Sequence, residues 1–290
     1  MFTGAMVALV TPFHDGKVDF ETLDELVDFQ LDNGIDAIVP VGTTGECPTL
    51  SHEEHKAVVE RVVKRVAGAT RVIAGAGSNS TAEAIELTAY AKKVGADATL
   101  QVCPYYNKPT QEGFYQHFKA IADEVDLPIV LYNIPGRCGA GLTPETVARL
   151  NEHDNIVAIK EATGSLDQAS EIAMRCDITI LSGDDSLTLP LASIGGKGVI
   201  SVVANIVPAD VKAMTDLILE GDLVKARQWH RKLFALSKNM LTLATNPIPI
   251  KAAMAMMDMC SEELRLPMTP LEDAKKAALH KTLENYGLLS

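Results

Sequence analysis

The run N-I-V-A-I-K-E-A-T-G, residues Asn155–Gly164, decides the fold class. Its apolar, β-branched part from Ile156 to Ile159 predicts a buried strand, and Lys160 comes directly after it. Near-continuous Val, Ile and Leu, without alternating polar residues, is typical of strands that are covered on both faces. The run therefore predicts one strand of a parallel sheet.

Seven further runs have the same character. They are Ala5–Val10, Ala37–Val41, Val72–Ala74, Ala98–Val102, Ile129–Tyr132, Ile178–Leu181 and Gly198–Val202. Between them, apolar residues return every three or four positions, which predicts helices. Eight strand-then-helix units in roughly 220 residues predict an α/β protein with a (β/α)8 TIM barrel, and a doubly wound open sheet is the alternative.

Helix boundaries are marked by capping residues. Ser51–Glu54 and Ser80–Glu83 match capping boxes, and Thr143 precedes a proline suited to the first helical position.

Strand signals end near residue 221. The remaining chain predicts helices over Leu223–Leu243 and Pro249–Met259, and a last helix capped by Thr269. We therefore expect a catalytic barrel over residues 1–221 and a C-terminal helical appendix over residues 222–290.

Charge and cysteine content exclude several classes of protein. Asp and Glu number 38 against 26 Lys and Arg, a net charge of −12, which argues against a nucleic-acid binder with a basic face. The chain has no apolar stretch of membrane-spanning length and no basic segment of a secretory signal. Five scattered cysteines without a C-x-x-C pair argue against a disulfide framework and a zinc site. We expect a cytoplasmic protein that binds neither membrane nor metal.

Active sites of such barrels lie at the carboxyl ends of the strands, where Lys160 is the first candidate. Burial would lower the pKa of its ammonium group, and a neutral amine can attack a carbonyl to form a Schiff base. The ordinary alternative is an ion pair with a neighbour such as Glu161. Lys251, in N-P-I-P-I-K, is a competitor, but the two prolines place it at the beginning of a helix.

The loop Gly42–Glu46, G-T-T-G-E, follows the second predicted strand. Its backbone amides and the hydroxyls of Thr43 and Thr44 would form a cradle for a carboxylate or phosphate. It lacks the lysine and the spacing of a P-loop. A tight turn without a ligand is the alternative.

Tyrosines and an arginine follow the fourth and fifth strands. Tyr105 and Tyr106 lie in P-Y-Y-N-K-P, and Tyr132 and Arg137 in Y-N-I-P-G-R. A buried tyrosine can pass protons within a hydrogen-bonded network, and an arginine can hold a carboxylate with two hydrogen bonds. A strand-edge tyrosine and a solvated arginine are the ordinary alternatives.

These motifs occur together in a characteristic order over essentially the whole chain. They are G-T-T-G-E, P-Y-Y-N-K-P, Y-N-I-P-G-R, I-K-E-A-T-G, S-G-D-D, G-V-I-S-V, N-P-I-P-I-K and L-R-L-P-M-T-P. In this respect the sequence closely resembles the dihydrodipicolinate (4-hydroxy-tetrahydrodipicolinate) synthase family. That family belongs to the class I pyruvate-dependent aldolases, which include N-acetylneuraminate lyase.

The resemblance implies a condensation of pyruvate with L-aspartate 4-semialdehyde, the first step of diaminopimelate and lysine biosynthesis, with no metal or organic cofactor. It implies that Lys160 forms the imine and that Tyr132 transfers protons. Thr43 and Tyr106 would complete a hydroxyl relay, with Tyr106 supplied by the neighbouring subunit. The active unit would then be a homodimer, and tetramers are usual in the family.

The resemblance also implies the substrate contacts. Thr44 would hold the carboxylate of pyruvate and Arg137 that of the semialdehyde. Gly183 and the backbone of Ile200 would line the pocket near the lysine.

A regulatory site for L-lysine is implied as well. It would consist of His52, His55, Asn79, Glu83 and Tyr105. The i,i+3 spacing places both histidines on one helical face, and Glu83 and the Tyr105 hydroxyl could bind an ammonium and a carboxylate.

The sequence departs from the family pattern at three positions. Cys47 and Pro48 stand where small residues such as Ser and Ala are more usual, and Cys138 where Thr is common.

Two rival functions remain at this stage. A lyase for a sugar acid would keep Lys160 and Tyr132, but it would need hydroxyl-matching polar groups where this chain has Arg137. A catalytically idle barrel would act as a binding or scaffold protein, with Lys160 held in an ion pair.

Overall fold

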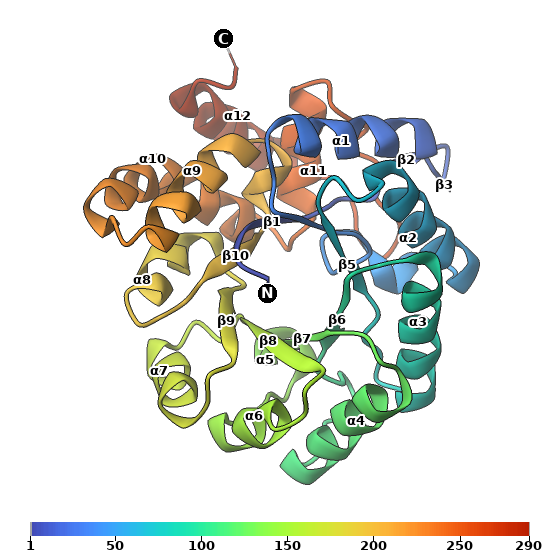
Figure 1. Ribbon diagram of the computed structural model, residues 1–290. Helices are drawn as coiled ribbons and strands as arrows, with labels where there is room; N and C mark the ends of the chain where they lie inside the picture. The colour runs from blue at the N-terminus through green and yellow to red at the C-terminus, as the bar shows by residue number, and fades with distance from the viewer. Residues whose placement is uncertain (1, 290) are drawn as a thin grey trace.

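The computed structural model describes residues 2–289, which form a closed barrel of eight parallel strands (Figure 1). Each strand pairs with its neighbours in chain order, and the first pairs with the last. The barrel strands are β1 (Gly4–Ala8), β4 (Ala37–Val39), β5 (Arg71–Gly75), β6 (Ala98–Val102), β7 (Ile129–Asn133), β8 (Ile156–Glu161), β9 (Thr179–Ser182) and β10 (Gly198–Ser201). All eight predicted strands are confirmed, and the open-sheet alternative is wrong because β1 pairs with β10.

Helices surround the barrel on its outside (Figure 1). Those that follow the strands are α1 (Phe20–Asp32), α2 (His52–Val66), α3 (Thr81–Val94), α4 (Gln111–Glu124), α5 (Pro135–Cys138), α6 (Pro144–Asn151), α7 (Leu166–Arg175), α8 (Thr188–Ala192) and α9 (Pro208–Leu219). Three short 3₁₀ turns, η1 (Cys47–Thr49), η2 (Asp185–Leu187) and η3 (Val203–Asn205), follow strand ends. A small antiparallel hairpin, β2 (Phe13–His14) with β3 (Lys17–Val18), was not predicted.

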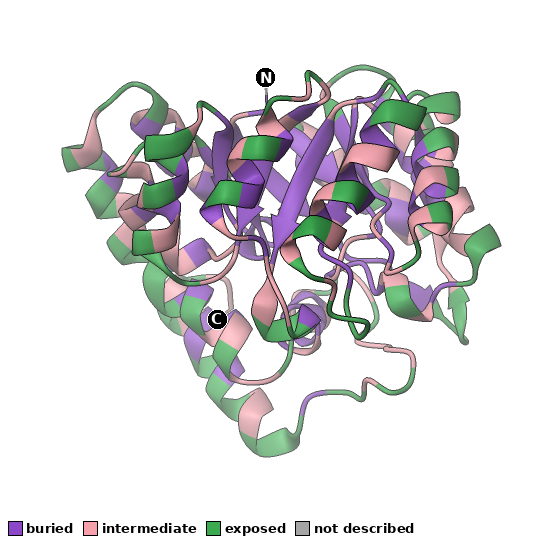
Figure 2. Ribbon diagram, turned by 90° about the horizontal axis from the view of Figure 1, so that it is seen from below, coloured by how far each residue is buried: buried purple, intermediate pink, exposed green. Residues whose placement is uncertain are grey.

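The strands alternate between two apolar environments. Met6, Val130 and Ala158 belong to a cluster from the inner faces of the strands, whereas Val7 and Leu131 pack outward beneath the helices. Figure 2 shows the consequence, with buried strands at the centre and exposed residues on the outer faces of the helices. Because side chains alternate along a strand, Lys160 shares the inner face with Ala158.

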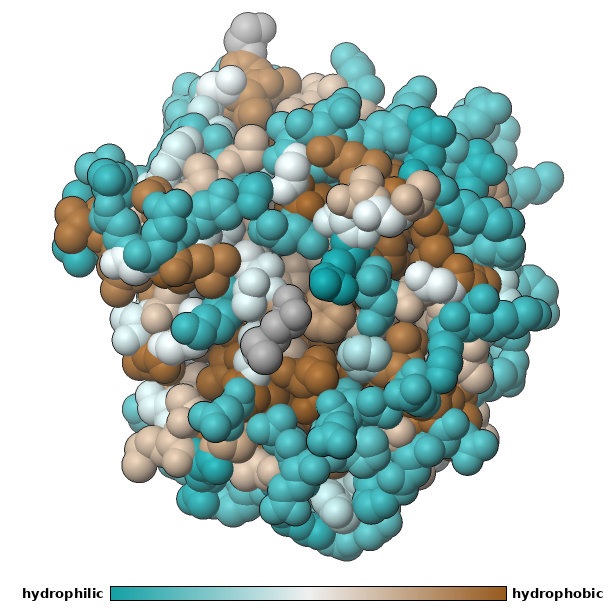
Figure 3. Space-filling model, in the orientation of Figure 1, coloured by the Kyte–Doolittle hydropathy of each residue, from teal (hydrophilic) through white to brown (hydrophobic). Residues whose placement is uncertain are grey.

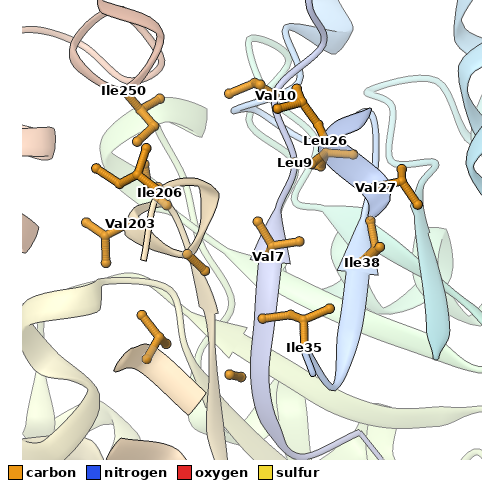
Figure 4. Packing of buried hydrophobic residues seen from close by; sticks show 14 of the residues in the cluster. Val7, Leu9, Val10, Leu26, Val27, Ile35, Ile38, Val203, Ile206 and Ile250 are labelled. Carbon is orange, nitrogen blue, oxygen red and sulfur yellow. The ribbon is translucent and has the colours of Figure 1, made fainter. Parts of the chain in front are cut away.

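The appendix consists of α10 (Leu223–Thr242), α11 (Ile248–Met256) and α12 (Asp273–Tyr286). Ile250 of α11 lies next to Ile206 in the cluster that also contains Val7 of β1 (Figure 4). The appendix therefore shares the apolar core of one side of the barrel, and its division from the barrel at residues 221 and 222 stays a prediction.

Two predicted helix caps need correction. The last helix does not begin at Thr269 but at Asp273, with Glu272 at its N-cap. Leu271, which is buried, holds this part of the chain against the core in a non-helical conformation, so the helix begins four residues after the favourable Thr–Pro signal. At Ser80 only half of the capping box forms, because the Glu83 carboxylate binds His52 and Ser78 instead.

The surface is mostly polar. Hydrophilic residues gather around the rim of the face seen in Figure 3, and apolar ones show between the helices. No helix among residues 2–289 is both long and apolar enough to cross a membrane.

Barrel closure generates a first prediction. Gly198 faces Gly4 where β10 meets β1, and a Cβ on Gly198 would lie 2.3 Å from the Gly4 carbonyl oxygen. Gly198→Ala should therefore lower the free energy of unfolding by about 1–3 kcal/mol, because backbone must separate to admit the methyl group. Urea titration measures this. The control is Gly136→Ala, whose Cβ would meet no atom within 4 Å; equal midpoints for the two variants would contradict the prediction.

Candidate active site

Lys160 and Tyr132 face each other inside the barrel. They are register partners on β8 and β7, each is about 5% exposed, and the Lys160 Nζ lies 4.3 Å from the centroid of the tyrosine ring. Burial lowers the pKa of Lys160 to about 8, although the carboxylates of Asp184 and Asp185 oppose the shift. A considerable fraction of the amine is thus neutral near physiological pH.

Glu161 does not pair with this lysine. It points to the opposite face of β8, where its carboxylate accepts hydrogen bonds from the Thr163 amide at 2.8 Å and the Asn133 side chain at 3.3 Å. The ion pair with Glu161 that the sequence left open is therefore wrong.

The loop Gly42–Glu46 brings two hydroxyls to the same end of the barrel. A hydrogen bond from Thr43 partly offsets the rise that burial causes in the pKa of Tyr132. Thr44 is buried, and its Oγ1 accepts a hydrogen bond of 3.0 Å from the Asn246 side chain. Gly75 permits this packing, because a Cβ there would lie 2.3 Å from the Val41 carbonyl oxygen.

Arg137 lies on the short helix α5, one residue after Gly136. Its Nη2 donates to the backbone oxygen of Asn246 at 2.9 Å. Its charge also acts on the two facing side chains, since it lowers the pKa values of Lys160 and Tyr132. The guanidinium group thus belongs to the same electrostatic environment as the amine.

Gly183 and Ile200 occupy the neighbouring strand ends. A Cβ on Gly183 would lie 2.5 Å from the Cβ of Ala162, so this position has no room for a side chain. Ile200, on β10, is fully buried in the inner-face cluster with Tyr132.

The structure does not bring Tyr106 to this group within one chain. Its side chain is 90% exposed, and its backbone has φ of 70°, in the left-handed region. An exposed ring at this position cannot pack against the buried amine of its own chain.

The competing lysine, Lys251, is fully buried on α11. Its Nζ lies 2.7 Å from Glu46 Oε1 and 2.6 Å from the Glu263 backbone oxygen. Its protons are engaged by these oxygens, whereas Lys160 faces an aromatic ring.

Asn246 and the Lys251–Glu46 pair are contacts that the sequence analysis missed. All three residues lie in motifs of the resemblance, but no local signal links positions about two hundred residues apart.

Four of the five residues predicted to bind L-lysine line one cleft. It has a volume of about 170 Å³ and is bounded by Cys47, Pro48, Leu50, His52, His55, Gly77, Ser78, Glu83, Leu87, Val102 and Tyr105. His52 Nε2 lies 2.7 Å from Glu83 Oε1, and His55 contacts the Gly75 carbonyl oxygen at 2.8 Å. The fifth residue, Asn79, does not line the cleft, but it donates to the carbonyl oxygen of the lining residue Tyr105 at 3.2 Å.

A second, much smaller cavity of about 30 Å³ adjoins this cleft. Cys47 and His55 line both cavities, and the smaller one reaches Thr43 and Tyr132. Burial raises the pKa of the Cys47 thiol to about 12, so the thiol is protonated in this wall.

We find no group of three or more His, Cys, Asp or Glu side chains placed to hold a metal ion in the part of the chain that the structure describes.

Known proteins resemble the chain over its full length. The family model described as the dihydrodipicolinate synthetase family matches residues 1–286. A 4-hydroxy-tetrahydrodipicolinate synthase of Pelobacter propionicus is 57% identical, with complete coverage of both chains. A dihydrodipicolinate synthase of Acinetobacter baumannii, solved with pyruvate, has a TM-score of 0.97 at 43% identity and full coverage of both chains. The enzyme of Cyanidioschyzon merolae, solved with lysine bound, has a TM-score of 0.96 at 43% identity, covering 99% of each chain.

The barrel and its relatives define a TIM-barrel lyase of the class I aldolase type. The chain belongs to the dihydrodipicolinate synthetase family. This membership supports a pyruvate condensation in lysine and diaminopimelate biosynthesis.

The lowered pKa generates a second prediction. Acetylation of Lys160 by acetic anhydride requires the neutral amine, so its rate should rise with pH around a midpoint near 8, below the ordinary lysine value of 10.5. Mass spectrometry of the peptide that contains Lys160 gives the rate. Asp184→Asn should lower the midpoint further, because the Asp184 carboxylate favours the ammonium form. A wild-type midpoint at the ordinary value would contradict the burial argument.

Proposed function

We propose that the chain condenses pyruvate with L-aspartate 4-semialdehyde, through a Schiff base on Lys160, to give 4-hydroxy-tetrahydrodipicolinate. The main support for this proposal is the buried amine with a pKa of about 8, set against Tyr132, which is itself hydrogen-bonded to Thr43. The solved relative that contains pyruvate supports the choice of the first substrate.

The first half of the reaction forms a nucleophile. The neutral Lys160 nitrogen attacks the keto carbon of pyruvate, and loss of one water leaves an iminium ion. The positive nitrogen withdraws electrons from the methyl group, so loss of a methyl proton gives an enamine. Tyr132 takes and returns these protons, and Thr43 links its hydroxyl to the relay.

The second half joins the substrates. The enamine carbon attacks the aldehyde carbon, and the aldehyde oxygen takes a proton to become the hydroxyl group. The semialdehyde amino group then replaces the Lys160 nitrogen at the former keto carbon, which closes the ring and frees the enzyme.

Two groups are suited to the substrate carboxylates. Thr44 binds that of pyruvate, and Arg137 binds that of the semialdehyde through charge-assisted hydrogen bonds. The backbones of Gly183 and Ile200 line the pocket near the amine. A cation at Arg137 favours a short aldehyde acid over a sugar acid, whose hydroxyls need other partners.

A neighbouring subunit completes the relay. The exposed Tyr106, on a loop with left-handed backbone, inserts its hydroxyl into the partner's site, so the active unit is a homodimer. Two such dimers form the tetramer. The cytoplasmic location stays a prediction.

L-lysine acts as a feedback inhibitor in the 170 Å³ cleft. Glu83 binds an ammonium group of the effector, and the Tyr105 hydroxyl donates to its carboxylate. Cys47 and His55 line both this cleft and the smaller cavity that reaches Tyr132. A lysine bound in the cleft therefore alters the active site through these two residues. The relative from Cyanidioschyzon merolae with lysine bound supports this regulation.

The proposal predicts a covalent adduct with pyruvate. Incubation with pyruvate and borohydride should reduce the imine and leave one carboxyethyl group on Lys160, detected by peptide mass spectrometry. Lys160→Ala should lose the label and nearly all turnover, whereas Lys119→Ala, at an exposed lysine of α4, should keep both. Labelling of another lysine with Lys160 unmodified would refute the mechanism, and a coupled assay with the semialdehyde tests the overall reaction.

A further prediction concerns regulation. L-lysine at millimolar concentration should inhibit turnover, and Glu83→Ala should weaken this inhibition about ten-fold or more, because an ammonium group loses its anion. Glu86→Ala, one turn along α3, removes a carboxylate that pairs with Lys56 outside the cleft and should leave the inhibition unchanged. If millimolar L-lysine leaves the turnover of the wild-type enzyme unchanged, the cleft is not a working regulatory site.

A further inference from the structure

A buried ion pair joins the C-terminal segment to the loop that carries Thr43 and Thr44. The Lys251 and Glu46 side chains are 0% and 2% exposed, and Nζ lies 2.7 Å from Oε1. The Lys251 ammonium also lies 4.2 Å from the centroid of the Phe13 ring, and Glu46 Oε2 accepts from the Arg265 amide at 3.2 Å. Both charged groups are thus fully surrounded by protein partners.

Such a pair is a poor source of stability. Removing two charges from water is costly, and their mutual attraction offsets this cost only in good geometry. Apolar side chains of similar volume would often serve stability as well or better. The pair therefore calls for a role other than holding the fold.

The Gly42–Glu46 loop needs an anchor, because its backbone is strained. Val41, just before the loop, and Glu46, its last residue, have φ of 49° and 55°. These values lie in the left-handed region, which is unfavourable for side chains and most of all for a β-branched one. Backbone of this kind persists only where its surroundings hold it. Glu46 is the last residue of the loop, so Lys251 holds one end of the strained segment.

Asn246 provides a second link, just before α11. Its Nδ2 donates to Thr44 Oγ1 at 3.0 Å, and its backbone oxygen accepts from Arg137 Nη2 at 2.9 Å. Because Thr44 Oγ1 accepts this bond, its own proton is free for another acceptor, as a substrate carboxylate requires. The two links lie five residues apart at the beginning of α11: Asn246 precedes the N-cap Pro247, and the Lys251 amide donates to the Pro247 carbonyl oxygen at 3.0 Å.

One short segment, residues 246–251, thus contacts both Arg137 and the loop that carries Thr44, the two groups suited to carboxylates. Asn246 touches Thr44 and Arg137 directly, and Lys251 holds the loop that carries Thr44. Asn246 Oδ1 is itself buried and lacks a hydrogen-bond partner among the described residues, so this side chain is not fully used by the fold.

We propose that Asn246, Lys251 and Glu46 form a C-terminal clamp, a set of positioning residues that places Thr44 and Arg137 for the two substrate carboxylates. The inference rests on the proposed function, since it takes these two residues as the substrate contacts. The appendix is then part of the substrate site.

The test separates binding from chemistry. Borohydride trapping of the pyruvate imine is measured against pyruvate concentration in Lys251→Met, Glu46→Gln, Asn246→Ala and the double variant Glu46→Gln/Lys251→Met. Each should raise the half-saturating pyruvate concentration about ten-fold, because Thr44 loses its fixed position, while the trapping rate at saturating pyruvate stays near that of the wild type. A purely structural role would lower the melting temperature without this split.

The double variant keeps the test decisive if a single variant fails to fold, because it leaves neither charge buried without its partner. The matched control is Lys276→Met, which breaks the Lys276–Glu262 ion pair of the same C-terminal segment away from the loop, and which should keep wild-type half-saturation.

Two negative results have different meanings. Folded variants of the clamp with wild-type half-saturation would overturn the clamp alone. A wild-type protein that forms no pyruvate adduct would overturn the proposed function, and the clamp with it.

Discussion

Closure of the barrel determines which side chains can meet at its carboxyl end. Parallel pairing of β1 with β10 places the carboxyl ends of all eight strands around one opening. Residues from distant parts of the chain meet there, including Thr43 after β4, Tyr132 at the end of β7 and Lys160 on β8. Once the ring is closed, the inner apolar layer beneath these residues excludes water, and this exclusion lowers the pKa of the lysine.

The sequence predicted those features that depend on short stretches of chain. Each barrel strand was predicted from its own apolar run. Lys160 stood out because a charge directly after a buried strand requires an explanation. The hairpin β2–β3 was missed because two-residue strands leave no periodicity, and the cap at Thr269 was misjudged because burial of Leu271 overrode a good local signal.

The site also depends on contacts that no local pattern can predict. Asn246 meets Thr44 across 202 positions, and Lys251 meets Glu46 across 205. The motifs that contain these residues were visible in the sequence, but the three-dimensional pairing follows only from the way α11 packs beside η3 and the loop. In the sequence, Lys251 was consequently a competitor of Lys160. In the structure, its buried ammonium group is paired with Glu46.

The distance along the chain between Glu46 and Lys251 has a consequence for synthesis on the ribosome. Chains fold from the N terminus as they emerge, so the loop with Glu46 is made long before its cation is available. Until the last helices leave the exit tunnel, this carboxylate has to remain hydrated and its strained loop unanchored. The loop that carries Thr43 and Thr44 therefore acquires its anchoring cation only after α11 has been synthesised.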